Sequence, residues 1–463
     1  MDFDFHKKRT NMIIDNIDSV VDKALKKKNL VIEPFKKDIL VAMKIVTDFI
    51  IEKERIIYGG IAQNEFIKLK SKENAFYKED SQDLPDYDVY SPEPIKDLVF
   101  LVNKLYDNGF TQVTGREAVH EGTYTIVLDR ITGPILDIHY VWSPHYKIIP
   151  KKKIGKFFYA DPEFMMIDMY KICTDPLLSF DFRIEKVFKR TSLLEQLYPI
   201  KADLKNFNKK IFNNMNDTIK NIINKIVTEY VSKNTTVMIS GIYCYNFFVQ
   251  QVDKSNTVNL DHLTLVTDNI YRVCDQILNL LIKLNMKDNI SIMIYHPFFE
   301  TFDKKIQIKY KDTVIVEIYG NMGRCVPYIT YKDNSNLEIN FISFHGLLLY
   351  FYGCLFMYKY NKKYNKLEFF RNLIYNLYKT RNNYLKNKKL TGLEKGIFAE
   401  LIVDCKFKTE DARLKQDKKI TQNIKKGKAP MYVYRPGKKR LDDKNLPQFI
   451  FNNTSGNLIN SKN

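Results

Sequence analysis

The sequence has few of the features that mark secreted, zinc-binding or membrane-spanning proteins. Its 463 residues include six cysteines, and no two of them form a Cys-x-x-Cys pair. Their even scatter argues against a disulfide framework or a zinc site, so we expect reduced, mostly buried thiols in an intracellular protein. The N-terminus is polar and charged, unlike a signal peptide. The longest apolar run, 344–358, is too short to span a bilayer. We therefore expect a soluble protein without membrane association.

The sequence has fewer acidic than basic residues, and the difference is concentrated in two segments. The chain has 73 Lys and Arg against 54 Asp and Glu, a formal net charge of +19. Residues 358–390 hold ten basic side chains and one acidic, and residues 404–444 hold 14 and six. A uniform compositional bias would spread the excess evenly along the chain. The concentration therefore predicts a polyanionic partner at the C-terminal end.

What is present suffices for a folded core. Hydrophobic residues make up 45% of the chain and aromatic residues 13%, which excludes global disorder. Helical periodicity over 11–52 predicts a preface of two or three helices. A short strand ending in two glycines, a helix, a strand, a helix and two strands are expected to follow (55–60, 61–67, 84–90, 95–108, 124–128 and 135–141). This order predicts an α+β domain with helices on one face of a mixed sheet.

A similar order of elements recurs in the second half of the chain. We match Gly60 with Gly241, Asp86-Tyr87-Asp88 with Asp261-His262-Leu263, and Leu136-Asp137-Ile138 with Val316-Glu317-Ile318. The match favours a duplicated domain, and chance similarity between two α+β domains is the alternative. Since Leu263 then replaces an acid, the second copy should hold metal poorly. It would serve as a structural element or as an RNA- or subunit-binding surface.

The predicted organisation has four parts. They are an N-terminal helical region, an active domain, a degenerate second copy, and a helical and basic C-terminal region (1–52, 53–185, 186–345 and 346–463). The fold class is α+β, with two mixed sheets.

Three acids form the candidate site. Asp86 and Asp88 lie two residues apart on a predicted strand, so both side chains point to one face. Asp137 lies on a later apolar strand, and an adjacent position in the sheet would bring it beside the pair. Hard divalent cations such as Mg²⁺ prefer oxygen ligands, and three convergent acids can hold two of them. Asp129 competes as third acid, but its neighbours indicate a turn.

The glycine pair supplies a second element of the site. Gly59 and Gly60 lie at a strand-to-helix turn, where the backbone can approach a triphosphate and the helix N-terminus favours negative charge. We assign nucleotide binding to Gly59, Gly60 and Asn64. A gap of 25 residues separates Gly60 from Asp86. The charged segment 71–83 accounts for this gap if it is an insertion.

The motifs Tyr58-Gly59-Gly60, Pro85-Asp86-Tyr87-Asp88-Val89-Tyr90-Ser91-Pro92 and Leu136-Asp137-Ile138 resemble the DNA-polymerase-β-like nucleotidyltransferase superfamily. Within it, the chain resembles the poly(A) polymerase catalytic subunits of large cytoplasmic DNA viruses, the poxvirus and giant-virus kind. The resemblance implies template-independent transfer of AMP from ATP to an RNA 3′-hydroxyl. It also implies dependence on Mg²⁺ or Mn²⁺, with Asp86, Asp88 and Asp137 as metal ligands and catalytic residues. The expected location is the host cytoplasm or the virion.

The basic segments suit single-stranded RNA, which favours a positive groove with aromatic faces. Six tyrosines lie among the ten basic residues of 358–390, although helical spacing makes some of them core residues. In 426–440, Pro430 and Pro436 exclude a helix, and a flexible tail is the alternative to RNA contact. The candidate RNA-binding residues there are Tyr432, Tyr434, Arg435, Lys438, Lys439 and Arg440.

Two other functions stay open at this point. Another RNA-tailing enzyme, such as a uridylyl or CCA-type transferase, would share the acids. A non-catalytic RNA-binding protein would have lost them. The partner that we expect is a single-stranded RNA 3′ end. A separate processivity subunit and a homodimer are both compatible with the sequence.

Overall fold

The computed structural model describes residues 3–77, 86–128, 133–175, 181–205, 207, 209, 216–299, 301–332, 336–391, 396–400, 402–407, 409, 411–437 and 441. Asp129 and three of the predicted RNA-binding residues, Lys438, Lys439 and Arg440, lie outside this set.

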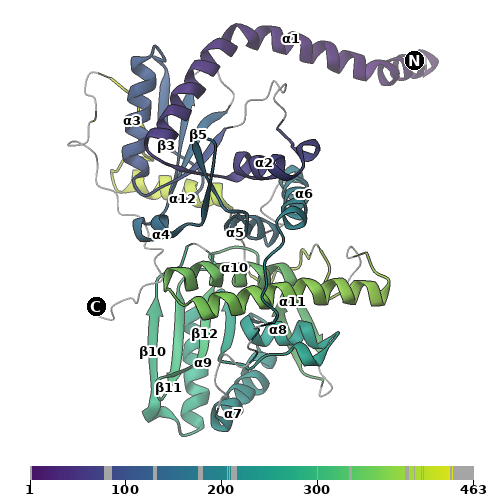
Figure 1. The fold of residues 1–463 in the computed structure, drawn as a ribbon, viewed down its shortest axis with the longest axis vertical. Coiled ribbons are helices and arrows are strands. Elements are labelled where there is room, and N and C mark those ends of the chain that lie inside the picture. Colours follow the sequence, from purple (N-terminus) through teal and green to yellow (C-terminus); the bar gives the residue numbers. More distant parts are fainter. Residues whose placement is uncertain are drawn as a thin grey trace.

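The N-terminal region is one helix rather than two or three. Helix α1 (Phe3–Glu52) runs without interruption and projects away from the body of the molecule (Figure 1). Its last turns are anchored, with Val46 and Phe49 fully buried. The spacing of apolar residues predicts a helix but does not show where the helix ends. The prediction of two or three helices was therefore wrong, because the backbone is helical throughout this range.

The first domain is built on an eight-stranded mixed sheet with the order β15-β3-β4-β5-β2-β1-β7-β6. The buried Arg55 forms a two-pronged ion pair with Asp97, which fixes the start of β1 against α3. The elements of this domain are β1 (Ile56–Tyr58), α2 (Gly59–Lys70), η1 (Lys72–Asn74), β2 (Tyr87–Ser91), α3 (Pro94–Asp107), β3 (Val113–Glu117), β4 (Thr123–Leu128), β5 (Pro134–Tyr140), α4 (Ser143–Ile148), β6 (Lys151–Ile154), β7 (Phe157–Ala160), α5 (Pro162–Cys173) and α6 (Asp181–Leu197).

The second domain repeats this topology. Its seven-stranded sheet has the order β10-β11-β12-β9-β8-β14-β13. Strand for strand this is the order β3-β4-β5-β2-β1-β7-β6, and each neighbouring pair has the same parallel or antiparallel sense in both sheets. The elements are α7 (Asp217–Lys225), η2 (Ile226–Tyr230), η3 (Val231–Lys233), β8 (Val237–Ser240), α8 (Gly241–Gln250), η4 (Lys254–Asn256), β9 (Leu263–Thr267), α9 (Ile270–Lys283), η5 (Lys287–Asn289), β10 (Ile290–Tyr295), β11 (Lys305–Tyr310), β12 (Thr313–Gly320), β13 (Tyr328–Lys332) and β14 (Glu338–Ile342).

The strand register corrects the sequence match between the copies by one residue. Asp88 pairs with Asp137 in the first sheet, and the corresponding pair in the second sheet is Thr264 with Glu317. Thr264, not Leu263, therefore stands where the first domain has Asp88. Leu263 is fully buried and belongs to the other face of the strand.

The C-terminal region does not form a domain of its own. Helices α10 (Phe344–Tyr360) and α11 (Tyr364–Lys388) lie beside the second sheet, whereas α12 (Ala412–Lys425) returns to the first domain (Figure 1). There β15 (Val433–Tyr434) pairs with β3 and completes the first sheet. Cys325 and Cys405 form a disulfide, with a Cα–Cα distance of 5.4 Å. The expectation of reduced thiols was therefore wrong for these two, because folding joins cysteines 80 residues apart.

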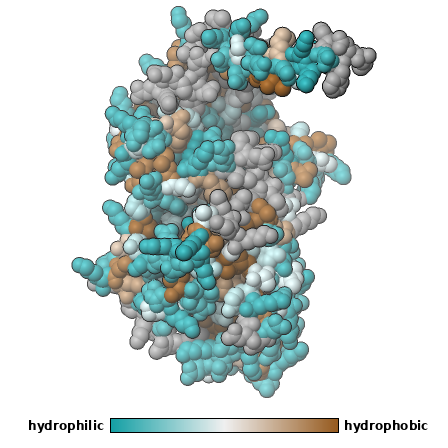
Figure 2. Space-filling model, turned by 90° about the vertical axis from the view of Figure 1, so that its right-hand side faces the viewer, coloured by the Kyte–Doolittle hydropathy of each residue, from teal (hydrophilic) through white to brown (hydrophobic). Residues whose placement is uncertain are grey.

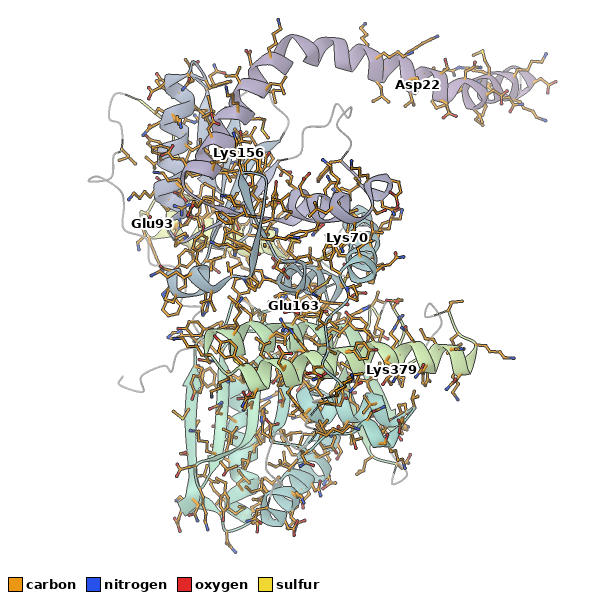
Figure 3. The ribbon with its side chains drawn as sticks, viewed as in Figure 1. Asp22, Lys70, Glu93, Lys156, Glu163 and Lys379 are labelled. Atoms are coloured by element: carbon orange, nitrogen blue, oxygen red, sulfur yellow. A yellow bond between two sulfur atoms is a disulfide. The ribbon has the colours of Figure 1, made fainter. Side chains whose placement is uncertain are left out.

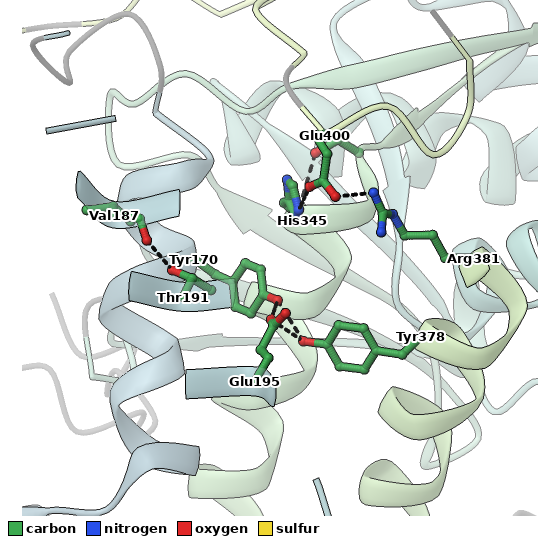
Figure 4. A network of polar contacts seen from close by, with 10 residues as sticks. Tyr170, Val187, Thr191, Glu195, His345, Tyr378, Arg381 and Glu400 are labelled. Carbon is green, nitrogen blue, oxygen red and sulfur yellow. Dashed lines mark hydrogen bonds and ion pairs between the residues drawn. The ribbon is translucent and has the colours of Figure 1, made fainter. Parts of the chain in front are cut away.

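Helices α5 and α10 occupy equivalent places in the two domains and pack against each other at the junction, where Glu163 lies (Figure 3). The Arg371 guanidinium reaches across to Glu163, with an N–O distance of 2.9 Å. Nearby, the half-buried Glu195 carboxylate accepts hydrogen bonds from the hydroxyls of Tyr170 and Tyr378 (Figure 4). These polar contacts fix the relative placement of the domains.

The surface in Figure 2 is mainly hydrophilic, with scattered hydrophobic groups and the projecting N-terminal helix. In the described ranges, no helix has the length and apolar character needed to cross a membrane.

Candidate active site

The three predicted acids meet on one face of the first sheet. Asp88 on β2 lies directly opposite Asp137 on β5 in a parallel pair. Neighbouring strands are about 4.8 Å apart, so aligned residues share a face and lie side by side. Asp86 directly precedes β2, two residues before Asp88. The sequence thus identified residues that folding brings together.

The electrostatics of the cluster show how closely the acids lie. Burial raises the pKa of Asp88 well above its ordinary value, and the charges of Asp86, Asp137 and Asp168 add to the rise. Burial also raises the pKa of Asp137, reinforced by Asp86 and opposed by the nearby Thr125 hydroxyl. Bringing these carboxylates together in their charged form costs free energy, which a bound cation would offset.

The donor set fits hard divalent cations. All the groups are carboxylates, and Asp137 Oδ1 is a buried oxygen with no hydrogen-bond partner in the described part of the chain. Among the same residues, no three His, Cys, Asp or Glu side chains are already arranged as a finished metal site.

The turn between β1 and α2 lies directly against Asp88. Gly59 has φ +66°, and a Cβ at this position would lie 2.2 Å from Asp88 Oδ2. Only glycine combines this backbone conformation with so close an approach. The Gly60 backbone N–H opposes the rise in the pKa of Asp88. The N-terminus of α2 thus faces the acids, where its backbone N–H groups favour negative charge.

Asn64 has a structural task. Its side chain is buried, and its Oδ1 accepts hydrogen bonds from the backbone N–H groups of Phe76 and Tyr77, at 2.9 Å each. The amide anchors the segment that follows α2 beside the site. Direct contact between Asn64 and nucleotide stays a prediction.

Two family models match the sequence. One, described as "Poly(A) polymerase catalytic subunit", covers residues 44–179. The other, "APMV, Putative poly(A) polymerase, catalytic subunit, C-terminal", covers residues 198–463, more than half of the chain. The chain belongs to the poly(A) polymerase catalytic subunit family.

Relatives of the family support this assignment. The putative poly(A) polymerase catalytic subunit of Acanthamoeba polyphaga mimivirus is 30% identical over 487 residues, 97% of this chain and 82% of the relative. That of African swine fever virus (isolate Pig/Kenya/KEN-50/1950) is 30% identical over 168 residues, 35% of this chain and 34% of the relative. The crystal structure of the Megavirus polyadenylate synthase matches with a TM-score of 0.85 and 29% identity, over 99% of this chain and 92% of that one. The predicted resemblance and the α+β fold class are confirmed.

Two polar residues beside the site of this poly(A) polymerase family member escaped sequence reasoning. Asp168 on α5 accepts a 2.6 Å hydrogen bond from the Tyr90 hydroxyl and lies close enough to raise the pKa of Asp88. Arg190 on α6 stacks on Phe76, with its guanidinium carbon 3.7 Å from the ring centroid. A Cβ at Gly60 would lie 3.1 Å from an Arg190 nitrogen. No spacing in the sequence links these helices to the acids.

The structure gives the predicted RNA-binding tyrosines other contacts. Tyr434 is buried in the first domain, and its hydroxyl donates to Asn103 Oδ1 at 2.6 Å. The ring of Tyr432 packs edge-on against Tyr124, and Arg435 donates to Thr114 Oγ1. A buried ring offers no free face for a base, so Tyr434 is not an exposed stacking platform. RNA contact by Tyr432 and Arg435 stays a prediction.

Proposed function

We propose that Asp86, Asp88 and Asp137 form the metal-binding catalytic site for the RNA polyadenylation that family membership assigns to this chain. ATP is the substrate, and a divalent cation is required. The observation that carries this assignment is the alignment of Asp88 with Asp137 beneath the Gly59 turn. We propose Mg²⁺ or Mn²⁺ as the ion, since both suit carboxylate oxygens.

The reaction joins the RNA 3′-oxygen to the α-phosphorus of ATP. The bond between the α-phosphorus and the bridging oxygen to the β-phosphate breaks, and pyrophosphate leaves. Divalent cations bound by the three carboxylates would activate the hydroxyl and neutralise charge on the triphosphate. Asp137 accepts the hydroxyl proton in this proposal.

The protein's own groups position the triphosphate. The backbone at Gly59 and Gly60 and the N-terminus of α2 receive its negative charge. Arg190 lies beside Gly60 and supplies a positive charge within reach of the same space. Tyr58 stacks on Tyr90 with ring centroids 3.9 Å apart, and Tyr90 is held by Asp168. This stack forms a rigid wall beside the acids.

A primer-extension assay tests the proposal. Labelled oligo(A) is incubated with each nucleoside triphosphate in turn and with Mg²⁺ or Mn²⁺. We expect a ladder with ATP that disappears in Asp88→Ala and persists in Asp275→Ala, the same substitution at an exposed aspartate of the second domain. A ladder that Asp88→Ala leaves undiminished would refute the metal site.

Partners and location are proposed on the resemblance. The RNA 3′ end is the acceptor. A processivity subunit and self-association both stay predictions, as do presence in the host cytoplasm and packaging in the virion.

A further inference from the structure

The second domain keeps the framework of the active site but changes its chemistry. Gly241 has φ +63°, and a Cβ there would lie 2.5 Å from Thr264 Oγ1, just as Gly59 lies against Asp88. Thr264 pairs with Glu317 as Asp88 pairs with Asp137. The two domains therefore share this framework but differ in the side chains at the acidic positions.

Neighbouring side chains donate hydrogen bonds to Glu317, the acid that the second domain retains. Glu317 accepts hydrogen bonds from Lys305 Nζ at 3.0 Å, Gln307 Nε2 at 2.6 Å and the Tyr319 hydroxyl at 2.8 Å. Asp137, its counterpart, has a buried carboxylate oxygen without a described partner. The acid of the second domain thus needs no metal ion.

His262 adds a second cation at this place. It stands two residues before Thr264, the position that Asp86 holds relative to Asp88. Its Nδ1 lies 3.0 Å from Asp261 Oδ2 and its Nε2 lies 3.5 Å from Glu317 Oε2. Lys305 and His262 therefore supply the positive charge that divalent cations would bring to the first domain.

A cavity of about 600 Å³ opens over this cluster, a volume typical of sites for small organic ligands. Glu317, His262 and Lys305 line it. Aromatic side chains make up much of the remaining wall: Tyr295, Phe298, Phe302, Tyr319, Tyr350, Tyr358 and Tyr360. Flat aromatic faces beside polar groups are the surroundings that nucleobases favour.

Lysines border the same cavity. Lys363 and Lys366 line it from the start of α11, and Lys366 lies over the Tyr358 ring at 5.5 Å. Both belong to the basic segment 358–390, which the catalytic site does not use. An aromatic interior bordered by lysines matches a base attached to a phosphodiester chain.

We propose that this cavity binds one nucleotide of an RNA strand without a metal ion. The base enters between the aromatic side chains, and Lys363 and Lys366 contact the flanking phosphates. The second domain is then an RNA-holding copy of the catalytic domain. The inference deepens the proposed function, because its ligand is the RNA acceptor of the same enzyme.

The test measures binding of labelled oligo(A) to the full-length protein in EDTA, where metal-dependent binding at the first site is absent. The double variant Lys363→Glu/Lys366→Glu should weaken binding about tenfold and lower the slope of log K against log salt by about 1–2. The matched control Lys283→Glu/Lys287→Glu, with the same charge change on exposed residues of the same domain, should change affinity less than about twofold. Should the double variant not fold, Lys363→Glu alone should weaken binding about threefold.

Photo-crosslinking locates the base. Oligo(A) carrying 8-azidoadenosine should crosslink to β10 or to the C-terminal turn of α10. Equal affinity in the cavity and control variants would overturn the proposal. Crosslinks confined to other segments would overturn it too, and this is the result expected if the cavity binds a protein partner instead of RNA. The catalytic assignment is tested separately, because Asp88→Ala should bind oligo(A) normally in EDTA whether or not it extends a primer.

Discussion

Gly59 and Asp88 are locked together: a single added carbon on Gly59 would lie 2.2 Å from the Asp88 carboxylate. Substitution of one residue therefore displaces the other. Because Asp88 stands at the centre of the proposed site, a change in the Gly59 turn should also change catalysis.

Gly59→Ala should reduce primer extension by about 100-fold or more, since displacing a catalytic group by about 1 Å has effects of this size. Gly109→Ala is the matched control. Gly109 also has positive φ (+95°), but no atom lies within 4 Å of its would-be Cβ. Both variants carry similar backbone strain, so comparable activity in the two would contradict the coupling.

Asp88→Asn should abolish extension yet stabilise the metal-free fold. Burial and three neighbouring acids raise the pKa of Asp88, so removing its charge relieves repulsion by about 1–2 kcal/mol. Thermal unfolding in EDTA and in Mg²⁺ measures this. Mg²⁺ should raise the unfolding temperature of the wild type more than that of the variant, and equal shifts would count against cation binding by Asp88.

Because of His262, the free energy of unfolding should fall as the pH rises into the alkaline range. Burial lowers the pKa of His262, but Asp261 and Glu317 outweigh it and raise the pKa from 6.5 to about 10. Because the folded-state value is the higher one, the stabilisation is complete below pH 6.5 and is lost as the pH rises toward 10. Comparing denaturant unfolding at pH 6.5 and 9.5, the wild type should lose about 1–3 kcal/mol more than His262→Gln. Parallel losses would exclude a charged His262.

Tyr434 should matter for stability rather than for RNA. Tyr434→Phe removes the hydrogen bond to Asn103 and should cost about 1 kcal/mol, and Tyr434→Ala should cost about 3–5 kcal/mol. Denaturant unfolding measures both. Oligo(A) affinity of the folded variants should equal that of the wild type, and a selective loss of affinity in Tyr434→Ala would restore a stacking role.

The disulfide should stabilise the fold under non-reducing conditions. Cys325 and Cys405 are separated by 80 residues, and closing a long loop typically contributes about 2–4 kcal/mol. Dithiothreitol should therefore lower the unfolding temperature of the wild type. Cys405→Ser should unfold at the reduced wild-type temperature with or without the reagent.

The sequence was sufficient to predict that the acids of the candidate site lie together, because strand periodicity and the glycine turn are local signals. Asp86 and Asp88 share a face by strand geometry alone, and Asp137 stands out as an acid in an apolar strand. Asp168 and Arg190 could not be found this way, since helix packing alone brings them to the acids. The one-residue error in matching Leu263 has the same origin, because register is set by pairing across the sheet.

Strand β15 covers the edge of the first sheet with residues that come after the whole second domain in the sequence. The chain must therefore be synthesised through Tyr434 before the first sheet is complete. Until then β3 is an open edge, and a nascent or shortened chain would expose it to pairing with other molecules.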